Sequence, residues 1–164
     1  MNPFPKFLLC LGLFGTAALL RGADTPAAPA AAPTPVAPAV KTAGPLKTDK
    51  LQLSPSEDET GFRRAVRVGN TLYISGSTAG GEMPDAIRKS YGNLQKILAH
   101  YGLGFQHVVK ETVYTTQFDA LKANTAVRRE FYGKEFPSST WVQVARLWDP
   151  AYVIEVELTA VFPE

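Results

Sequence analysis

The chain has few of the side chains from which disulfides and metal sites are built. Of its 164 residues, one is cysteine, Cys10, and two are histidine, His100 and His107. A single cysteine excludes a disulfide framework within the chain. Two histidines without a partner cysteine or an HExxH pattern do not complete a zinc shell. We therefore expect neither a metal site nor a cofactor.

The chain also lacks an excess of positive charge where a folded domain is expected. Three of the 17 basic residues (Lys6, Arg21 and Lys41) and one of the 15 acidic residues (Asp24) lie before residue 46, so 14 residues of each sign remain after it. Phosphate binding needs clustered Lys and Arg side chains. This balance argues against a nucleic-acid partner and against ribonuclease activity.

Residues 1–23 have the features of an export signal. Lys6 supplies a positive start, and residues 7–20 form an apolar run that is short for a membrane span. Ala23 is a candidate for the last residue removed, although Arg21 stands where a small side chain is preferred. We expect a periplasmic or secreted protein that contacts a membrane only if this segment is retained as an anchor. The alternative interpretation is an ordinary buried helix.

Residues 24–45 are rich in alanine and contain six of the 13 prolines. Proline fixes φ and removes a backbone donor, so we expect an extended, semi-rigid linker without a core of its own. Residues 46–164 are enough for one domain. The hydrophobic content of the whole chain, 45%, is typical of a globular protein.

Hydrophobic periodicity in this domain predicts two helices and five strands. Apolar residues recur at helical spacing from Ile87 to Leu98, and Ile154 and Val156 alternate with glutamates in the last strand. The order β-β-α-β-α-β-β, with both helices on one face of a mixed sheet, predicts a two-layer α+β domain. The expected elements are two strands within 64–76, a helix over 84–102, a strand over 108–116, a helix over 119–133, and strands over 141–147 and 152–162.

Capping and turn residues place the ends of several elements. Gly69 and Asn70 suit a hairpin turn between the first two strands. Asp119 is expected to cap the start of the second helix, and Gly133 to end it. Gly102 suits the end of the first helix.

The sheet face away from the helices is expected to mix charged and aromatic side chains. Alternation puts Glu155 and Glu157 there, together with Tyr114, Trp141 and Tyr73. A face of this composition suggests association with further copies of the chain.

Several motifs occur in an order that resembles one protein family. They are residues 69–76 (GNTLYISG), 93–94 (NL), 108–114 (VVKETVY), 136–137 (FP), 142–147 (VQVARL) and 154–157 (IEVE). Over nearly all of residues 60–164, their order and spacing are similar to the RidA family, also called YjgF and formerly labelled endoribonuclease L-PSP. The resemblance implies a chorismate-mutase-like fold and a homotrimer with a barrel-like centre. It also implies small-molecule clefts at the subunit interfaces.

The resemblance further implies an activity and a set of site residues. Active members hydrolyse enamines or imines, such as 2-aminoacrylate, to a 2-keto acid and ammonia. Glu155 matches the glutamate that orients the attacking water, and Ser75 and Gly76 match a turn that lines the cleft. Phe62 falls where an aromatic residue lines it, and Asn124 lies about one place from an expected asparagine.

One residue that the resemblance leads us to expect is missing. Ser139 stands where active members have an arginine that binds the substrate carboxylate. A serine hydroxyl can hydrogen-bond a carboxylate but cannot neutralise it, so 2-imino acids fit this chain less well than active members. Arg63, Arg64 or Arg128 of a neighbouring subunit could supply the missing charge. The alternative interpretation of Ser139 is a residue at the start of a strand without a ligand.

Two functions remain open at this point. One is an exported hydrolase of enamines, imines or related small molecules, with Glu155 orienting water. The other is a non-catalytic trimer that binds a small molecule between subunits. From the strand pattern alone, Glu155 could also be an ordinary solvated residue.

Overall fold

The computed structural model describes residues 44–164. The expected export signal, residues 1–23, and nearly all of the expected linker lie outside the described residues, so both stay predictions. No helix of the described part is long and apolar enough to cross a membrane.

Eleven elements follow one another in the described part of the chain. They are β1 (Thr48–Leu51), α1 (Ser56–Thr60), β2 (Ala65–Val68), β3 (Thr71–Gly80), α2 (Met83–His100), a 3-10 turn η1 (Phe105–His107), β4 (Val108–Thr115), α3 (Phe118–Ala123), α4 (Thr125–Tyr132), β5 (Ser138–Gln143) and β6 (Tyr152–Val161).

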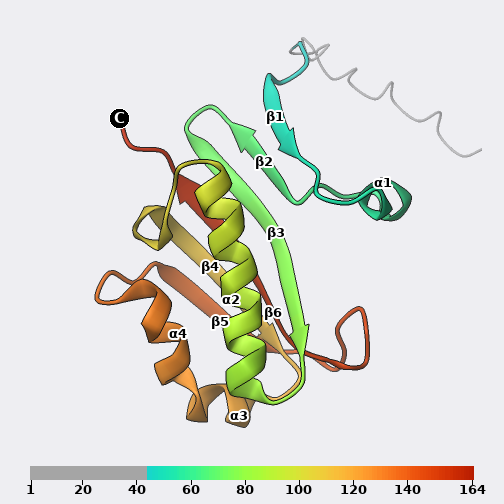
Figure 1. Ribbon diagram of the computed structural model, residues 1–164, viewed down its shortest axis with the longest axis vertical. Helices are drawn as coiled ribbons and strands as arrows, with labels where there is room; N and C mark the ends of the chain where they lie inside the picture. Colours follow the sequence, from blue (N-terminus) through green and yellow to red (C-terminus); the bar gives the residue numbers. More distant parts are fainter. Residues whose placement is uncertain (1–43) are drawn as a thin grey trace, which may run out of the picture. The chain divides into compact units, whose positions relative to one another are not determined.

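The six strands form one mixed sheet in the order β1-β2-β3-β6-β4-β5. Neighbouring strands are antiparallel, except that β4 and β5 are parallel. Figure 1 shows α2 and α4 lying over the same face of this sheet. The expected two-layer α+β architecture is therefore confirmed.

Helix α2 forms where the apolar periodicity predicts it. Pro84 lies in its first turn, where a backbone N–H has no helical partner in any case. Gly102 follows the helix with a φ of 70°, a left-handed conformation that favours glycine. The apolar residues at helical spacing are buried: Ile87, Tyr91, Leu94 and Leu98.

The last strand, β6, divides its side chains between the two faces as expected. Ile154, Val156 and Leu158 are buried beneath the helices. Glu155 and Glu157 lie half-buried on the opposite face. This alternation decides which residues can face a ligand on the side that the helices leave open.

The second expected helix is divided in two at Asn124. The Asn124 side chain donates a hydrogen bond to the carbonyl oxygen of Ala120 at 2.9 Å, which competes with the helical backbone ladder. Asp119 lies inside the first turn of α3 rather than at its cap, which is Gln117. Gly133 ends α4 as expected. Neither β1 nor α1 was expected, because segments of four and five residues carry too little periodicity.

Strand β5 begins and ends earlier than the sequence indicates. It pairs in parallel with β4 from Lys110–Ser138 to Thr115–Gln143, so the ladder sets its limits. The expected face of Trp141 is wrong. Trp141 pairs with the fully buried Val113 and packs against the core on the helix side.

Candidate functional site

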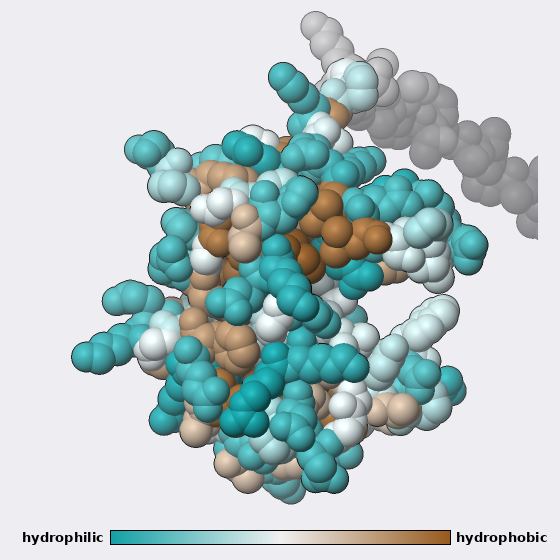
Figure 2. Space-filling model, viewed as in Figure 1, coloured by the Kyte–Doolittle hydropathy of each residue, from teal (hydrophilic) through white to brown (hydrophobic). Residues whose placement is uncertain are grey.

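A cavity of about 550 Å³ lies beside α1 and the loop that precedes β6. Figure 2 shows a hollow at this place, between the part of the surface around α1 and that loop. The cavity brings together four residues that the sequence singles out: Phe62, Ser75, Gly76 and Glu155. Because Glu155 lies on the sheet face opposite α2 and α4, the cavity opens on that side of the sheet.

Strand β3 bulges at the two residues that match the family turn. The register with β6 shifts between Ile74 and Ser77, which leaves Ser75 and Gly76 out of the regular pairing. The Ser75 hydroxyl donates to the carbonyl oxygen of Arg63 at 2.6 Å, and the Ser75 N–H donates to that of Arg64 at 3.0 Å. The bulge is thereby fixed against the segment before β2.

The carboxylate of Glu155 rests directly on the backbone of Gly76. A Cβ atom added at Gly76 would overlap the Glu155 Oε1 atom and crowd its Cδ and Cγ atoms. The requirement for glycine therefore comes from this close approach, and it fixes where the carboxylate lies in the cavity.

The protein raises the pKa of the Glu155 carboxyl above its usual value of 4.5. Burial is the larger cause, because it disfavours the ionised form, and the negative charge of Glu157 adds to it. A carboxyl group with a raised pKa accepts a proton from water more readily than an ordinary one. Perturbed groups of this kind in a cavity are candidates for catalysis.

Aromatic side chains and one arginine complete much of the cavity wall. Phe62 is 37% exposed, and the guanidinium carbon of Arg64 lies 5.1 Å from the centre of its ring. Trp148, from the loop before β6, is 82% exposed at the rim, and Tyr152 lines the wall beside it. Arg64 and Glu155 are the charged residues of this lining.

Ser139 lies on the opposite face of the sheet from Glu155 within one chain. It pairs with Glu111 of β4, and its hydroxyl donates to the Glu111 Oε1 atom at 2.8 Å. Ser139 remains exposed at the start of the edge strand β5. It is not part of the cavity around Glu155, so its role in a cleft between subunits stays a prediction.

Ser139 belongs to a polar cluster around the fully buried carboxylate of Glu111. The Arg128 Nε atom donates to Oε1 at 2.9 Å. Hydroxyl groups of Tyr91 and Tyr132 donate to Oε2 at 2.9 and 2.7 Å. Burial, followed by the charge of Glu111, raises the pKa of both tyrosines well above their usual range, so both stay protonated and donate. We call this group the Glu111 cluster: Tyr91, Glu111, Arg128, Tyr132, Ser139 and Trp141.

Sequence reasoning missed the Glu111 cluster, although one signal was available. In the strand VVKETVYT, Glu111 alternates with Val113 and Thr115, which places an acid on the buried face. A buried carboxylate requires donors, and the order of the strands decides which side chains supply them.

Asn124 also lies outside the cavity around Glu155 within one chain. Its side chain is engaged with Ala120 at the break between α3 and α4. Its expected contact with a ligand therefore stays a prediction for an assembly of several chains. Within residues 44–164, no three His, Cys, Asp or Glu side chains gather into a group that could hold a metal ion.

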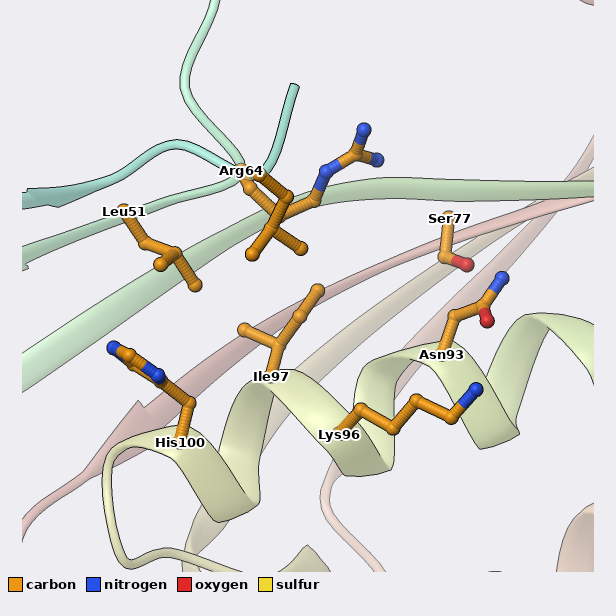
Figure 3. A pocket seen from close by; sticks show the side chains of 8 residues that line it. Leu51, Arg64, Ser77, Asn93, Lys96, Ile97 and His100 are labelled. Carbon is orange, nitrogen blue, oxygen red and sulfur yellow. The ribbon is translucent and has the colours of Figure 1, made fainter.

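A second cavity, of about 460 Å³, lies between α2 and the β1 end of the sheet. Figure 3 shows Asn93, Lys96, Ile97 and His100 of α2 facing it. Of the residues expected to contact a ligand from the resemblance, none lines it. Arg64 lies between the two cavities and contributes to both.

Comparison with known proteins gives the same family from sequence and from structure. The family model described as "Endoribonuclease L-PSP" matches residues 54–162. A "2-iminobutanoate/2-iminopropanoate deaminase" of Dermatophagoides farinae is 29% identical over 95 residues, which cover 52% of this chain and 74% of the relative. A "RutC family protein" of Pyrococcus horikoshii is 28% identical over 108 residues, covering 60% of this chain and 85% of the relative.

The fold is shared with solved structures. The crystal structure of a YjgF-family protein from Mycobacterium tuberculosis superimposes with a TM-score of 0.65 at 25% identity. The match covers 70% of this chain and 99% of that one. It confirms the expected chorismate-mutase-like fold.

Proposed function

Because the chain belongs to the endoribonuclease L-PSP family, which is also called YjgF or RidA, we propose that it hydrolyses small imines or enamines in the cavity around Glu155. The observation that carries this proposal is the position of the Glu155 carboxylate, held against Gly76 inside the cavity with a raised pKa. The similarity to a 2-iminobutanoate/2-iminopropanoate deaminase supports the same class of reaction.

The proposed reaction needs one group that takes and returns a proton. The Glu155 carboxylate accepts a proton from water, and the water oxygen forms a bond to the imine carbon while the C=N electron pair moves to nitrogen. The protonated Glu155 then gives its proton to the amine nitrogen of this adduct. The Glu155 carboxylate next takes the hydroxyl proton of the adduct and passes it to the nitrogen, so the C–N bond breaks as the C=O bond forms and ammonia leaves. An enamine first gains a proton on its β-carbon and loses one from its nitrogen, which gives the imine.

The test is release of a 2-keto acid from 2-aminoacrylate or 2-iminobutanoate generated in the assay. A rate that rises in proportion to protein concentration supports the hydrolase. A rate that stays at background at high protein concentration contradicts it.

A non-catalytic binding protein is the second candidate. It is favoured by Ser139, which stands in place of the expected arginine and whose hydroxyl is engaged with Glu111. Saturable binding of small acids in a thermal-shift screen, together with no turnover in the assay above, would support a non-catalytic binding protein.

We propose that the active form is a homotrimer. The face of the sheet away from the helices exposes Tyr73 (52%) and Val142 (39%) beside the half-buried Glu157. Apolar groups on an open sheet face are typical of a surface that binds further copies. Light scattering on the purified domain, residues 44–164, is expected to give three times the mass of one chain. The mass of a single chain would contradict the trimer.

The raised pKa of Glu155 should set the lower pH limit of activity, with burial as its larger cause and the charge of Glu157 as the smaller one. Since burial and Glu157 raise the pKa of Glu155, and the ionised form acts as the base, activity falls as pH drops through this raised value. Glu157→Gln removes one negative charge, lowers the pKa of Glu155 and moves the acidic limb of the kcat/KM profile to lower pH.

Tyr114→Phe is the matched control for this shift. The Tyr114 hydroxyl donates to Glu157 at 3.3 Å, so the variant removes this hydrogen bond but keeps the charge. Its acidic limb is expected to stay close to that of the wild type. If Glu157→Gln and the wild type have the same pH profile of kcat/KM, Glu155 is not the base on which the activity depends.

A further inference from the structure

Hydrogen bonds of the Arg64 backbone hold this residue at the edge of the cavity around Glu155. Its carbonyl oxygen accepts the N–H of Ser75 at 3.0 Å, and its N–H donates to the Glu57 Oε2 atom at 3.2 Å. The first contact joins the residue before β2 to the bulge on which the Glu155 carboxylate rests, and the second joins it to α1. These contacts hold Arg64 at the edge of the cavity, although the sequence alone does not distinguish it from Arg63.

The guanidinium group of Arg64 has few partners. Its contact with Glu57, between Nη2 and Oε1, is 3.4 Å long. Its Nε atom is buried and has no hydrogen-bond partner among the described residues. Arginine carries five N–H donors, and a buried donor without a partner calls for an explanation. Figure 3 shows this group pointing away from α2 and Lys96.

The ion pair with Glu57 leaves the Arg64 guanidinium able to bind a second carboxylate. Its side chain is 1% exposed, and its two oxygens already accept the backbone N–H groups of Leu53 and Arg64, each at 3.2 Å. The Arg64 side chain keeps 27% of its surface exposed and stands over the Phe62 ring. A second carboxylate can therefore reach the guanidinium from the cavity.

The charges of the cavity complement a small acid that carries an imine. Arg64 is the cation among the residues that line it, and Glu155 is the carboxylate. We propose that Arg64 binds the substrate carboxylate from within the same chain, in place of the arginine that Ser139 replaces. The substrates are then 2-imino acids rather than neutral imines. This inference rests on the proposed function, since it assigns the substrate class of the same site.

Arg63 provides a control of the same residue type. It is the sequence neighbour of Arg64, and its side chain is similarly exposed, at 33%. Its guanidinium pairs with Asp58 at 2.6 Å and donates to the carbonyl oxygen of Phe62. It lines a different cavity, without Glu155.

The experiment compares Arg64→Gln, Arg63→Gln and the wild type on two substrates. One is an imine of a 2-keto acid, and the other is the corresponding imine of the 2-keto amide, which lacks the negative charge. We expect Arg64→Gln to raise KM for the acid by roughly 10- to 150-fold, the loss expected for one charge-assisted contact. The kcat value, the KM for the amide, and all values for Arg63→Gln should remain close to the wild type.

Binding of pyruvate, measured by calorimetry, separates failure of this inference from failure of the proposed function. Weaker binding of pyruvate to Arg64→Gln than to Arg63→Gln supports the inference, even if the wild type shows no turnover. The absence of turnover would contradict only the proposed hydrolase activity. Equal binding by the two variants overturns the inference, as does the absence of pyruvate binding by the wild type.

Thermal melting shows whether Arg64→Gln is folded, because Arg64 also contacts Glu57. If Arg64→Gln does not fold, Glu57→Gln provides a second test of whether the Arg64 guanidinium binds a carboxylate. It removes the charge that competes for Arg64, and pyruvate is expected to bind more tightly. Unchanged or weaker binding to Glu57→Gln would contradict the role of Arg64.

Discussion

Replacing Glu155 with glutamine is expected to lower the release of keto acid by roughly 100- to 10,000-fold, the usual contribution of a general base. Glutamine has nearly the same shape as glutamate and can pack against the Gly76 backbone in the same way, but its amide cannot take a proton from water. Binding of pyruvate should remain, because Arg64 is unchanged. The measurement is kcat with an imine generated in the assay, at saturating substrate.

Two further variants test whether the position of this carboxylate matters. Glu135→Gln removes an exposed glutamate that does not line the cavity around Glu155 and should leave the rate unchanged. Gly76→Ala keeps every charge but places a Cβ atom where the Glu155 carboxylate lies, so it should also lower kcat. If Glu155→Gln retains the rate of the wild type, another group activates the water and the proposed mechanism fails.

Replacing Arg128 with methionine is expected to destabilise the domain by about 3–5 kcal/mol, the cost of leaving one buried charge without its partner. The Arg128 side chain is 9% exposed and donates to Glu111, which is not exposed at all. Its guanidinium carbon also lies 4.6 Å from the centre of the Tyr132 ring and 5.4 Å from that of Trp141. The measurement is the free energy of unfolding in urea, and the loss should appear as a lower midpoint with an unchanged slope.

Arg88→Met is the matched control for this loss. Arg88 pairs with Glu130 at 3.7 Å, but both side chains are more than half exposed. Exposed pairs contribute only about 0–1 kcal/mol, so this variant should unfold close to the wild type. Equal effects of the two substitutions would mean that the Glu111 cluster is not held by its ion pair.

Much of the fold could be predicted from local patterns. Helix α2 and strand β6 were predicted because their periodicity is set by the core, which needs apolar side chains on one face only. The Gly69–Asn70 turn was predicted because glycine tolerates the φ of 61° that the hairpin requires. The strand β1 could not be predicted, because it forms only by pairing with β2.

Part of the candidate site could likewise be predicted from the sequence, and part could not. Phe62, Ser75, Gly76 and Glu155 were singled out through their match to family motifs, and they do meet in one cavity. Arg64 was only one of three arginines named, because its neighbour Arg63 has the same charge in the sequence. What distinguishes their side chains is tertiary: the Arg63 side chain pairs with Asp58, whereas Arg64 lines the cavity that contains Glu155.

The sequence by itself determined the family, the two-layer architecture and the position of a glutamate on the open face of the last strand. Periodicity and motif order are local properties, and they are readable without the fold. Only the tertiary structure decided that Ser139 and Trp141 turn toward Glu111, because strand pairing, and not strand propensity, sets the face of an edge strand. It also decided that Arg64 and Glu155 line one cavity, since the two lie 91 positions apart in the sequence and each packs against the bulge of β3.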